Sequence, residues 1–148
     1  MPDKKLKFKI GLAVITSLII IAAIFLPEYL LKRKINSIID ECQFLIENDR
    51  LVEILKFFSK NYFDKSKRTA EDIKLKIEEE QRFIKKIKLN IIKKKFNEIR
   101  SSSVKLYIET IVSFSAPNAQ SFDGIARIEL IFSKDKDGNW KINYLDIN

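Results

Sequence analysis

Few side chains in this sequence could carry out acid–base or nucleophilic chemistry. Its 148 residues include no histidine, the residue type that most often serves as a general base or metal ligand. Cys42 is the only cysteine, and Thr110 and Tyr144 are the polar residues at inward positions of the strands described below. The carboxylates of Asp40 and Glu41 lie close to Cys42 in the sequence. We therefore predict no catalytic residue, no cofactor, no metal ion and no enzymatic activity.

Cys42 is expected to be a buried structural residue. It belongs to an apolar series with the spacing of one helix face: Leu31, Ile35, Ile38, Ile39, Cys42, Leu45 and Ile46. A free cysteine in such a series behaves as a small hydrophobic residue. Asp40 and Glu41 flank this face, where carboxylates are usually solvated.

An alternation of oxygen-bearing side chains at Asp135, Asp137 and Asn139 resembles a calcium-binding loop. The match fails because Gly138 is fourth from Asp135 rather than sixth, and Asp146 replaces the glutamate of the twelfth position. The Asp-Gly pair is instead typical of a tight hairpin. We predict a turn at this place and no metal site.

The last third of the chain contains the strands that would position these residues. Apolar and polar residues alternate over 104–114 and over 126–132, which indicates half-buried strands. A final strand is predicted over 140–147. Its apolar phase shifts from Trp140, Ile142 and Tyr144 to Leu145 and Ile147, which indicates a bulge.

Residues 83–99 are ambiguous, because their apolar residues fit the spacing of both a helix and a strand. We favour a strand, since the sheet needs another one and a helix over 70–100 would be unusually long for a small domain.

Two further helices are predicted before this segment. One begins after a candidate N-cap at Asp49, and the other begins at Thr69, which forms a capping box with Asp72. The expected fold class is α+β, in which an N-terminal transmembrane helix precedes about three helices packed on a curved antiparallel sheet of three or four strands.

Residues 10–26 form an uncharged apolar run of 17 positions, directly after four lysines. A cleaved signal peptide is the alternative, but no A-x-A-like site of small residues follows the run. We therefore predict an uncleaved membrane anchor. The expected division is a short basic tail over 1–9, a transmembrane anchor over 10–27 and a soluble α+β domain over 28–148.

The predicted location is the cell inner (cytoplasmic) membrane, with a cytoplasmic N-terminus and an extracytoplasmic C-terminal domain. Positive charge is only slightly greater before the run than after it, so the positive-inside rule favours this orientation modestly. Seven basic residues are candidates for lipid headgroup contact: Lys4, Lys5, Lys7, Lys9, Lys32, Arg33 and Lys34. The formal net charge of +8 is spread along the chain rather than concentrated, so no nucleic-acid partner is expected.

The order of elements and the final Asp-Gly-Asn-Trp-Lys-Ile hairpin (137–142) resemble the nuclear transport factor 2-like fold. The resemblance covers 28–148 and implies a cone in which the sheet curves over the first helix. Such a cone serves some members as an active site and others as a partner-binding surface. In architecture alone, an anchor before such a domain also resembles the inner-membrane assembly subunit of type IV secretion systems.

A second resemblance is to type IV pilins, which also begin with a hydrophobic helix and end in an antiparallel sheet. The segment from Ala22 to Tyr29 resembles the pilin helix around its proline. Aligned on Pro27, however, Lys5 stands where the cleavage glycine belongs, and Ile10 stands where the buried glutamate belongs.

From these observations we expect a single-pass, membrane-anchored, non-enzymatic binding or assembly module in a membrane or envelope complex. Its expected partners are membrane lipid, other membrane or envelope proteins and, in a homo-oligomer, further copies of this chain. The alternatives are a pilin-like filament subunit and a pocket domain that binds a small ligand or acts as an enzyme. Tyr107, Ile111 and Ile131 are apolar residues on the outward strand faces and are the candidate partner-binding residues.

Overall fold

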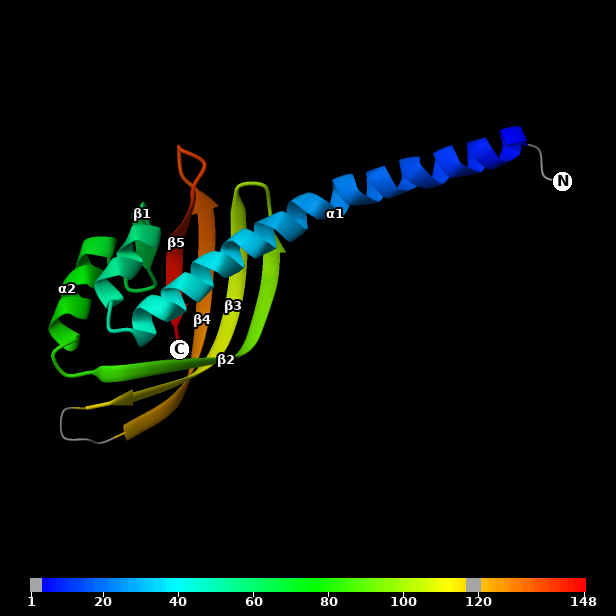
Figure 1. The fold of residues 1–148 in the computed structure, drawn as a ribbon. Coiled ribbons are helices and arrows are strands. Elements are labelled where there is room, and N and C mark those ends of the chain that lie inside the picture. The colour runs from blue at the N-terminus through cyan, green and yellow to red at the C-terminus, as the bar shows by residue number, and fades with distance from the viewer. Residues whose placement is uncertain (1–3, 117–120) are drawn as a thin grey trace. The chain divides into compact units, whose positions relative to one another are not determined.

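The computed structural model describes residues 4–116 and 121–148, with side chains described at 11 and from 13 onward (Figure 1). The chain forms two compact units, Met1–Ser37 and Ile38–Asn148. The predicted division into a basic tail over 1–9, an anchor over 10–27 and a soluble domain over 28–148 stays a prediction.

The first unit is the larger part of α1, a helix that spans Lys4–Glu47 and has Pro27 inside it. Its large apolar side chains are exposed from Val14 to Leu30. Among the residues searched, one helical stretch, Ala13–Glu47, is long and apolar enough to cross a membrane. A run of exposed apolar side chains is typical of a surface that meets lipid or another protein.

The second unit is an α+β domain, as predicted. Its described residues contain one sheet with the order β1-β5-β4-β3-β2, formed by β1 (Phe58–Asp64), β2 (Lys85–Ile99), β3 (Ser103–Ser115), β4 (Ser121–Lys134) and β5 (Trp140–Ile147). The sheet is curved, and the end of α1 lies across one of its faces (Figure 1). The strand favoured for 83–99 is confirmed as β2.

The sheet has five strands rather than three or four, because β1 was not predicted. β1 is parallel to β5, and its register is interrupted between Phe58 and Phe63. Ser59, Lys60 and Asn61 are weak strand formers, so the segment has no clear alternation. The residues of β1 contain no pattern that indicates pairing with a strand some eighty residues later in the chain.

Two short helices connect α1 to β2. The second predicted helix is a 3-10 helix, η1 (Leu51–Phe57), which Arg50 rather than Asp49 precedes. Asp49 has a φ of 58° and lies in the left-handed region, so the N-cap predicted there is wrong. The capping box is confirmed at α2 (Ala70–Glu80), where the Asp72 N–H donates to Thr69 Oγ1 at 3.3 Å and the Thr69 N–H donates to Asp72 at 2.7 Å.

The core lies between the end of α1 and the sheet. Its buried apolar residues in the second unit are Ile39, Leu45, Tyr62, Val104, Leu106, Ile108, Leu130, Phe132, Trp140 and Ile142. Apolar side chains alternate on one face of β3 and β4, which pair without a register shift from Ser103 to Ser115. This regular pairing gives the inner face its continuous row of apolar side chains.

A buried carboxylate fixes the loop between β1 and α2. Asp64 is 4 % exposed, and its oxygens accept hydrogen bonds from the Ser66 N–H at 2.8 Å, the Arg68 N–H at 2.9 Å and Arg68 Nε at 2.6 Å. Burial alone would raise the pKa of Asp64, but these hydrogen bonds outweigh it and lower the pKa below its ordinary value of 3.8.

Replacing Asp64 with asparagine should lower the free energy of unfolding by about 1–3 kcal/mol at pH 7, because the Arg68 guanidinium loses a charged acceptor. Since the pKa of the folded state is the lower one, this stabilisation is complete above pH 4 and is lost as the pH falls through that pKa. Urea unfolding followed by Trp140 fluorescence should show that the free energies of unfolding of the two proteins become equal in acid. Asp137→Asn, at an exposed turn, is the control and should unfold like the parent.

Candidate functional site

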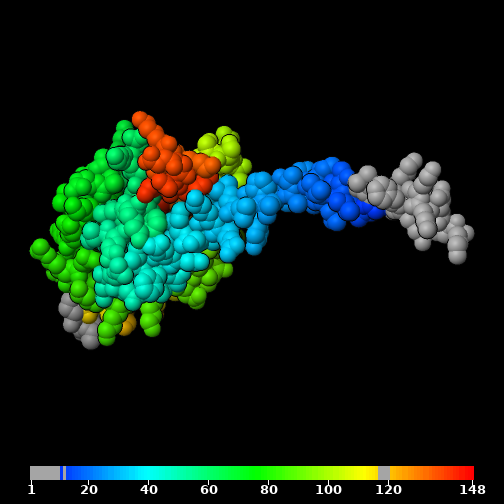
Figure 2. Space-filling model, turned by 45° about the horizontal axis from the view of Figure 1, so that its top comes forward, coloured from blue at the N-terminus to red at the C-terminus, as the bar shows by residue number. Residues whose placement is uncertain are grey.

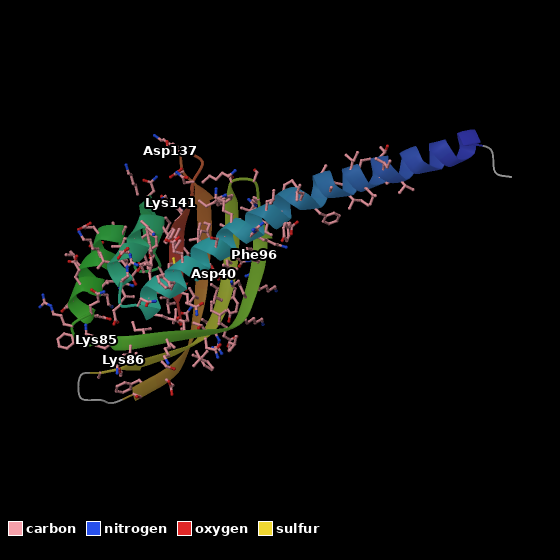
Figure 3. All side chains as sticks on the ribbon, viewed as in Figure 1. Asp40, Lys85, Lys86, Phe96, Asp137 and Lys141 are labelled. Carbon is pink, nitrogen blue, oxygen red and sulfur yellow. The ribbon has the colours of Figure 1, made fainter. Side chains whose placement is uncertain are left out.

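A cavity of about 120 Å³ lies within the second unit, between the end of α1, η1, the start of β1 and the inner face of the sheet. The lining residues are Ile39, Cys42, Gln43, Ile46, Ile54, Phe58, Leu89, Ile91, Ile108, Thr110, Ile128, Leu130, Ile142 and Leu145. None of these fourteen carries a charge. Larger hollows occur on the surface, but their linings include exposed charged side chains, as at the β4–β5 turn near Asp137 (Figure 3).

The cavity lining follows from strand alternation. Ile108 pairs with Ile128, and Ile91 pairs with Thr110, so successive inward residues of β2, β3 and β4 form rows across the sheet. On α1, Ile39, Cys42 and Ile46 have the spacing of one helix face. A helix face and a sheet face that are both apolar therefore enclose the space.

Thr110 provides the one hydroxyl among the lining residues. It is 1 % exposed, as its predicted inward position requires. Its hydroxyl donates to the Ile111 carbonyl oxygen at 3.3 Å, a long hydrogen bond. The Thr110 hydroxyl is therefore paired within the sheet and adds no accessible polar surface to the cavity.

Cys42 lines the cavity as a neutral thiol. Burial is the main cause that raises its pKa to about 12, with a further contribution from the charge of Glu41, while Lys56 opposes them. A thiol of this pKa is protonated at neutral pH and is not a nucleophile. Cys42 is half-buried rather than fully buried, and its expected structural role stays a prediction.

Gln43 is the lining residue whose importance was missed. Its Nε2 donates to the Leu89 carbonyl oxygen at 2.9 Å and to Glu47 at 3.2 Å, and Glu47 accepts from the Leu89 N–H at 2.9 Å. Two side chains of α1 thus pair with both backbone groups of one residue of β2. The signal was present in the spacing, since Gln43 lies four residues after Ile39 and three before Ile46 on the apolar face.

Tyr144 does not line the cavity, contrary to prediction. The bulge expected in β5 is confirmed, because Ile131 pairs with Tyr144 while Phe132 pairs with Ile142. This register shift occurs before Tyr144, so Ile142 and Leu145 face the cavity. Tyr144 instead contacts Phe63 edge-to-face, with 5.9 Å between the ring centroids.

Asp40 and Glu41 do not line the cavity either. Both are exposed, and Asp40 is labelled on α1 in Figure 3. Glu41 forms an ion pair with Lys56, and Figure 2 accordingly shows the end of α1 beside η1.

The candidate partner-binding residues lie on β3 and β4, and their role stays a prediction. Tyr107, Ile111 and Ile131 are half-buried, and Ile111 pairs with Ile125 whereas Ile131 pairs with Lys105. Tyr107, which pairs with Glu129, lies in the row next to Ile131, and the row of Glu109 and Arg127 separates it from Ile111. Ion pairs on this face join Lys105 to Glu129 at 3.0 Å and Arg127 to Glu109 at 3.5 Å.

Among the candidate lipid-headgroup residues, Lys32 pairs with Glu28 at 2.6 Å, while Arg33 and Lys34 are exposed. The side chains of Lys4, Lys5, Lys7 and Lys9 lie outside the described part of the chain.

The predicted turn is confirmed at Asp135, Asp137 and Asn139. Asp135 Oδ1 accepts the N–H groups of Asp137 at 3.0 Å and Asn139 at 2.8 Å, and Gly138 has a φ of 79°. No group of three or more His, Cys, Asp or Glu side chains suited to a metal ion occurs among the described residues.

Comparison with known proteins shows the fold. No family model matches the sequence, and no curated protein matches it significantly. A nuclear transport factor 2-like superfamily protein from Salmonella enterica has a TM-score of 0.70 and 12 % identity over 82 % of this chain and 92 % of its own. The chain therefore has a nuclear transport factor 2-like fold, as the resemblance implied.

Two proposed enzymes from Novosphingobium aromaticivorans share this fold. A proposed scytalone dehydratase has a TM-score of 0.69 and 12 % identity, and covers 82 % of this chain and 85 % of its own. A proposed aromatic ring hydroxylase has a TM-score of 0.68 and 8 % identity, and the match covers 78 % of this chain and 85 % of the hydroxylase chain.

These neighbours overturn two predictions, the non-enzymatic assembly module and the absence of enzymatic activity. They favour the alternative of a pocket domain that binds a small ligand or acts as an enzyme. The physical reason for the error is that the lack of candidate acids and bases was taken to favour an assembly module over a pocket domain, whereas a binding pocket needs only apolar space between packed elements. At these identities the likeness concerns the fold, not the reactions of those proteins.

The environment of Cys42 predicts slow alkylation. With its pKa raised from 9.0 to about 12, iodoacetamide should modify the folded chain at least about a hundredfold more slowly than the urea-unfolded chain at pH 8. Intact-mass measurement of the alkylated fraction over time checks this rate, with Cys42→Ala as the unlabelled control. Equal rates in the two states would show that the thiol is not enclosed.

Proposed function

We propose that the second unit binds a small apolar molecule in the cavity between α1 and the sheet. The observation that carries this proposal is the cavity of about 120 Å³ with fourteen uncharged lining residues. An apolar cavity of about 150 Å³ stays dry and binds benzene or xenon, so a space of nearly this size favours an apolar guest over water.

The accessible surface of the cavity is apolar, since the Thr110 hydroxyl donates to the Ile111 carbonyl oxygen and the Gln43 amide nitrogen donates to Leu89 and Glu47. Cys42 stays protonated at neutral pH, so it adds no charge to the lining. The pocket is thus suited to an apolar molecule.

The test is to fill the cavity from one strand. Ile128→Phe places a larger side chain among the lining residues, whereas Ile125→Phe makes the same change at a position of β4 that is 59 % exposed. The full chain in lipid nanodiscs is titrated with benzene and with hexane, and the methyl resonances of Ile108 and Ile142 are followed by NMR.

Saturable shifts are expected in the parent and in Ile125→Phe, with at least about tenfold weaker binding in Ile128→Phe. A melting curve by circular dichroism establishes that the filled variant is folded. Unsaturable shifts in the parent, or equal binding in both variants, would contradict the proposal.

We also propose that α1 anchors the chain in a membrane through 10–27, with residues 1–9 in the cytoplasm and the second unit outside it. The exposed apolar side chains from Val14 to Leu30 support the anchor, and the four lysines before the run support the orientation. Arg33 and Lys34 would lie near lipid headgroups.

Cysteine accessibility tests this orientation. In a Cys42→Ala background, Ser102→Cys at the exposed β2–β3 turn should react with a membrane-impermeant maleimide in bacterial cells with permeabilised outer membranes. Lys5→Cys should react only after the inner membrane is lysed. The reverse pattern would place the second unit in the cytoplasm, and loss of both proteins to the soluble fraction would exclude the anchor.

A further inference from the structure

We infer that η1 is a lid over this cavity and that Lys56 is the latch that holds the lid closed against α1 and β5. This inference rests on the binding pocket proposed above and concerns how a guest enters and leaves it. It follows from the weak internal support of η1, from the two hydrogen bonds of Lys56 and from the lining residues that lie next to them.

A guest can enter this cavity only when one of its walls moves, because none of the fourteen lining residues is exposed. Continuous pairing of β3 with β4 holds the sheet wall together. Gln43 and Glu47 fix α1 to the backbone of Leu89, and α1 also buries Ile39 and Leu45. The remaining wall is η1 with the start of β1, and no residue of η1 is buried.

η1 has little support of its own. A 3-10 helix seldom exceeds about three or four residues because its hydrogen bonds have poor geometry, whereas η1 has seven residues. Arg50, which precedes it, provides no side-chain cap. Segments with few buried side chains open locally at a low free energy. Opening of η1 should therefore be far more frequent than unfolding of the sheet.

The backbone is irregular at both ends of η1. Before it, Asp49 has a φ of 58°. After it, the register of β1 with β5 is interrupted between Phe58 and Phe63. Residues at the ends of elements are those that absorb backbone rotation when a lid moves. η1 can thus move as one piece between Asp49 and the interruption in β1.

Lys56 connects η1 to the two walls beside it. Its Nζ donates to Glu41 of α1 in an ion pair, and its carbonyl oxygen accepts a hydrogen bond from Lys141 Nζ of β5 at 2.6 Å. Lys141 is labelled in Figure 3. The Lys56 carbonyl lies in the last turn of η1, where carbonyl groups have no partner within the helix. Lys141 therefore pairs with a group that the helix itself leaves unpaired.

Both connections lie one residue from the cavity lining. Glu41 precedes the lining residue Cys42. Lys141 precedes the lining residue Ile142, and η1 itself contributes Ile54 to the lining. When the two connections break, η1 can move away from the rim of the cavity and uncover the Cys42 thiol.

The ion pair gives the closed lid only modest stability. The Lys56 and Glu41 side chains are 50 % and 48 % exposed. Water and salt weaken ion pairs between exposed side chains. The closed position is thus favoured, but a guest does not have to wait for the domain to unfold.

The first experiment measures alkylation of Cys42 by iodoacetamide in the full chain in lipid nanodiscs at pH 8. Lys141→Met removes the connection to β5 and leaves in place Glu41 and Lys56, the charges that act on the pKa of Cys42. We expect alkylation about three- to tenfold faster than in the parent. Lys136→Met, at the exposed β4–β5 turn, is the matched control and should react like the parent. Equal rates in Lys141→Met and the parent would overturn the latch.

Asp64→Asn separates lid opening from unfolding of the whole domain. The hydrogen-bond partners of Asp64 are Ser66 and Arg68 rather than residues of η1, so this variant weakens the domain and leaves the latch intact. Its alkylation rate should stay within about twofold of the parent rate. A rate raised as much as in Lys141→Met would show that Cys42 reacts through global unfolding, and would overturn the lid.

Benzene exchange provides the second experiment, in which methyl resonances of Ile108 and Ile142 give the rate constant of benzene dissociation. Glu41→Lys and Lys56→Glu each break the ion pair and should accelerate dissociation about two- to fivefold. The double variant restores the pair and should restore the parent rate. Equal rates in all four proteins would overturn the role of the ion pair and leave the pocket supported. If benzene does not bind the parent, the pocket proposal fails, and the Cys42 alkylation rates still support or overturn the lid.

Discussion

The docking of the last turns of α1 on the inner face of the sheet is the interaction on which the second unit depends. Ile39, Cys42 and Ile46 supply the apolar contact surface, and Gln43 and Glu47 bind the backbone of Leu89 at 2.9 Å each. The apolar contacts are not directional, so the hydrogen bonds determine where along β2 the helix lies. The cavity is the space that remains where these two surfaces do not fully interdigitate.

Local sequence patterns predicted the elements whose apolar residues repeat regularly. They failed where the position of an element depends on pairing with a distant strand. Alternation in β3 and β4 and the Thr69–Asp72 capping box were visible in the sequence. The position of β1 was not, because β5 supplies its hydrogen bonds from far along the chain. The bulge in β5 was predicted, but its place relative to Tyr144 is set by pairing with β4.

The same distinction applies to the candidate site. Thr110 was predicted because strand alternation alone places it inward. Gln43 was not predicted, because its hydrogen-bond acceptor is the backbone of Leu89, 46 residues later in the chain. Function was misjudged for a related reason. The absence of histidine argues against one kind of chemistry, but enclosure depends on how a helix and a sheet fit together, and the sequence does not encode that in any single motif.

β2 forms one edge of the sheet, and unpaired strand edges invite pairing with other chains. Here Gln43 and Glu47 occupy both backbone groups of Leu89, and a register shift between Ile91 and Lys93 interrupts the strand just beyond. Exposed lysines follow at 93 and 95. The helix that closes the pocket therefore also blocks this edge as a template for β-aggregation, so a change that frees α1 from Leu89 would expose the chain to self-association as well as opening the cavity.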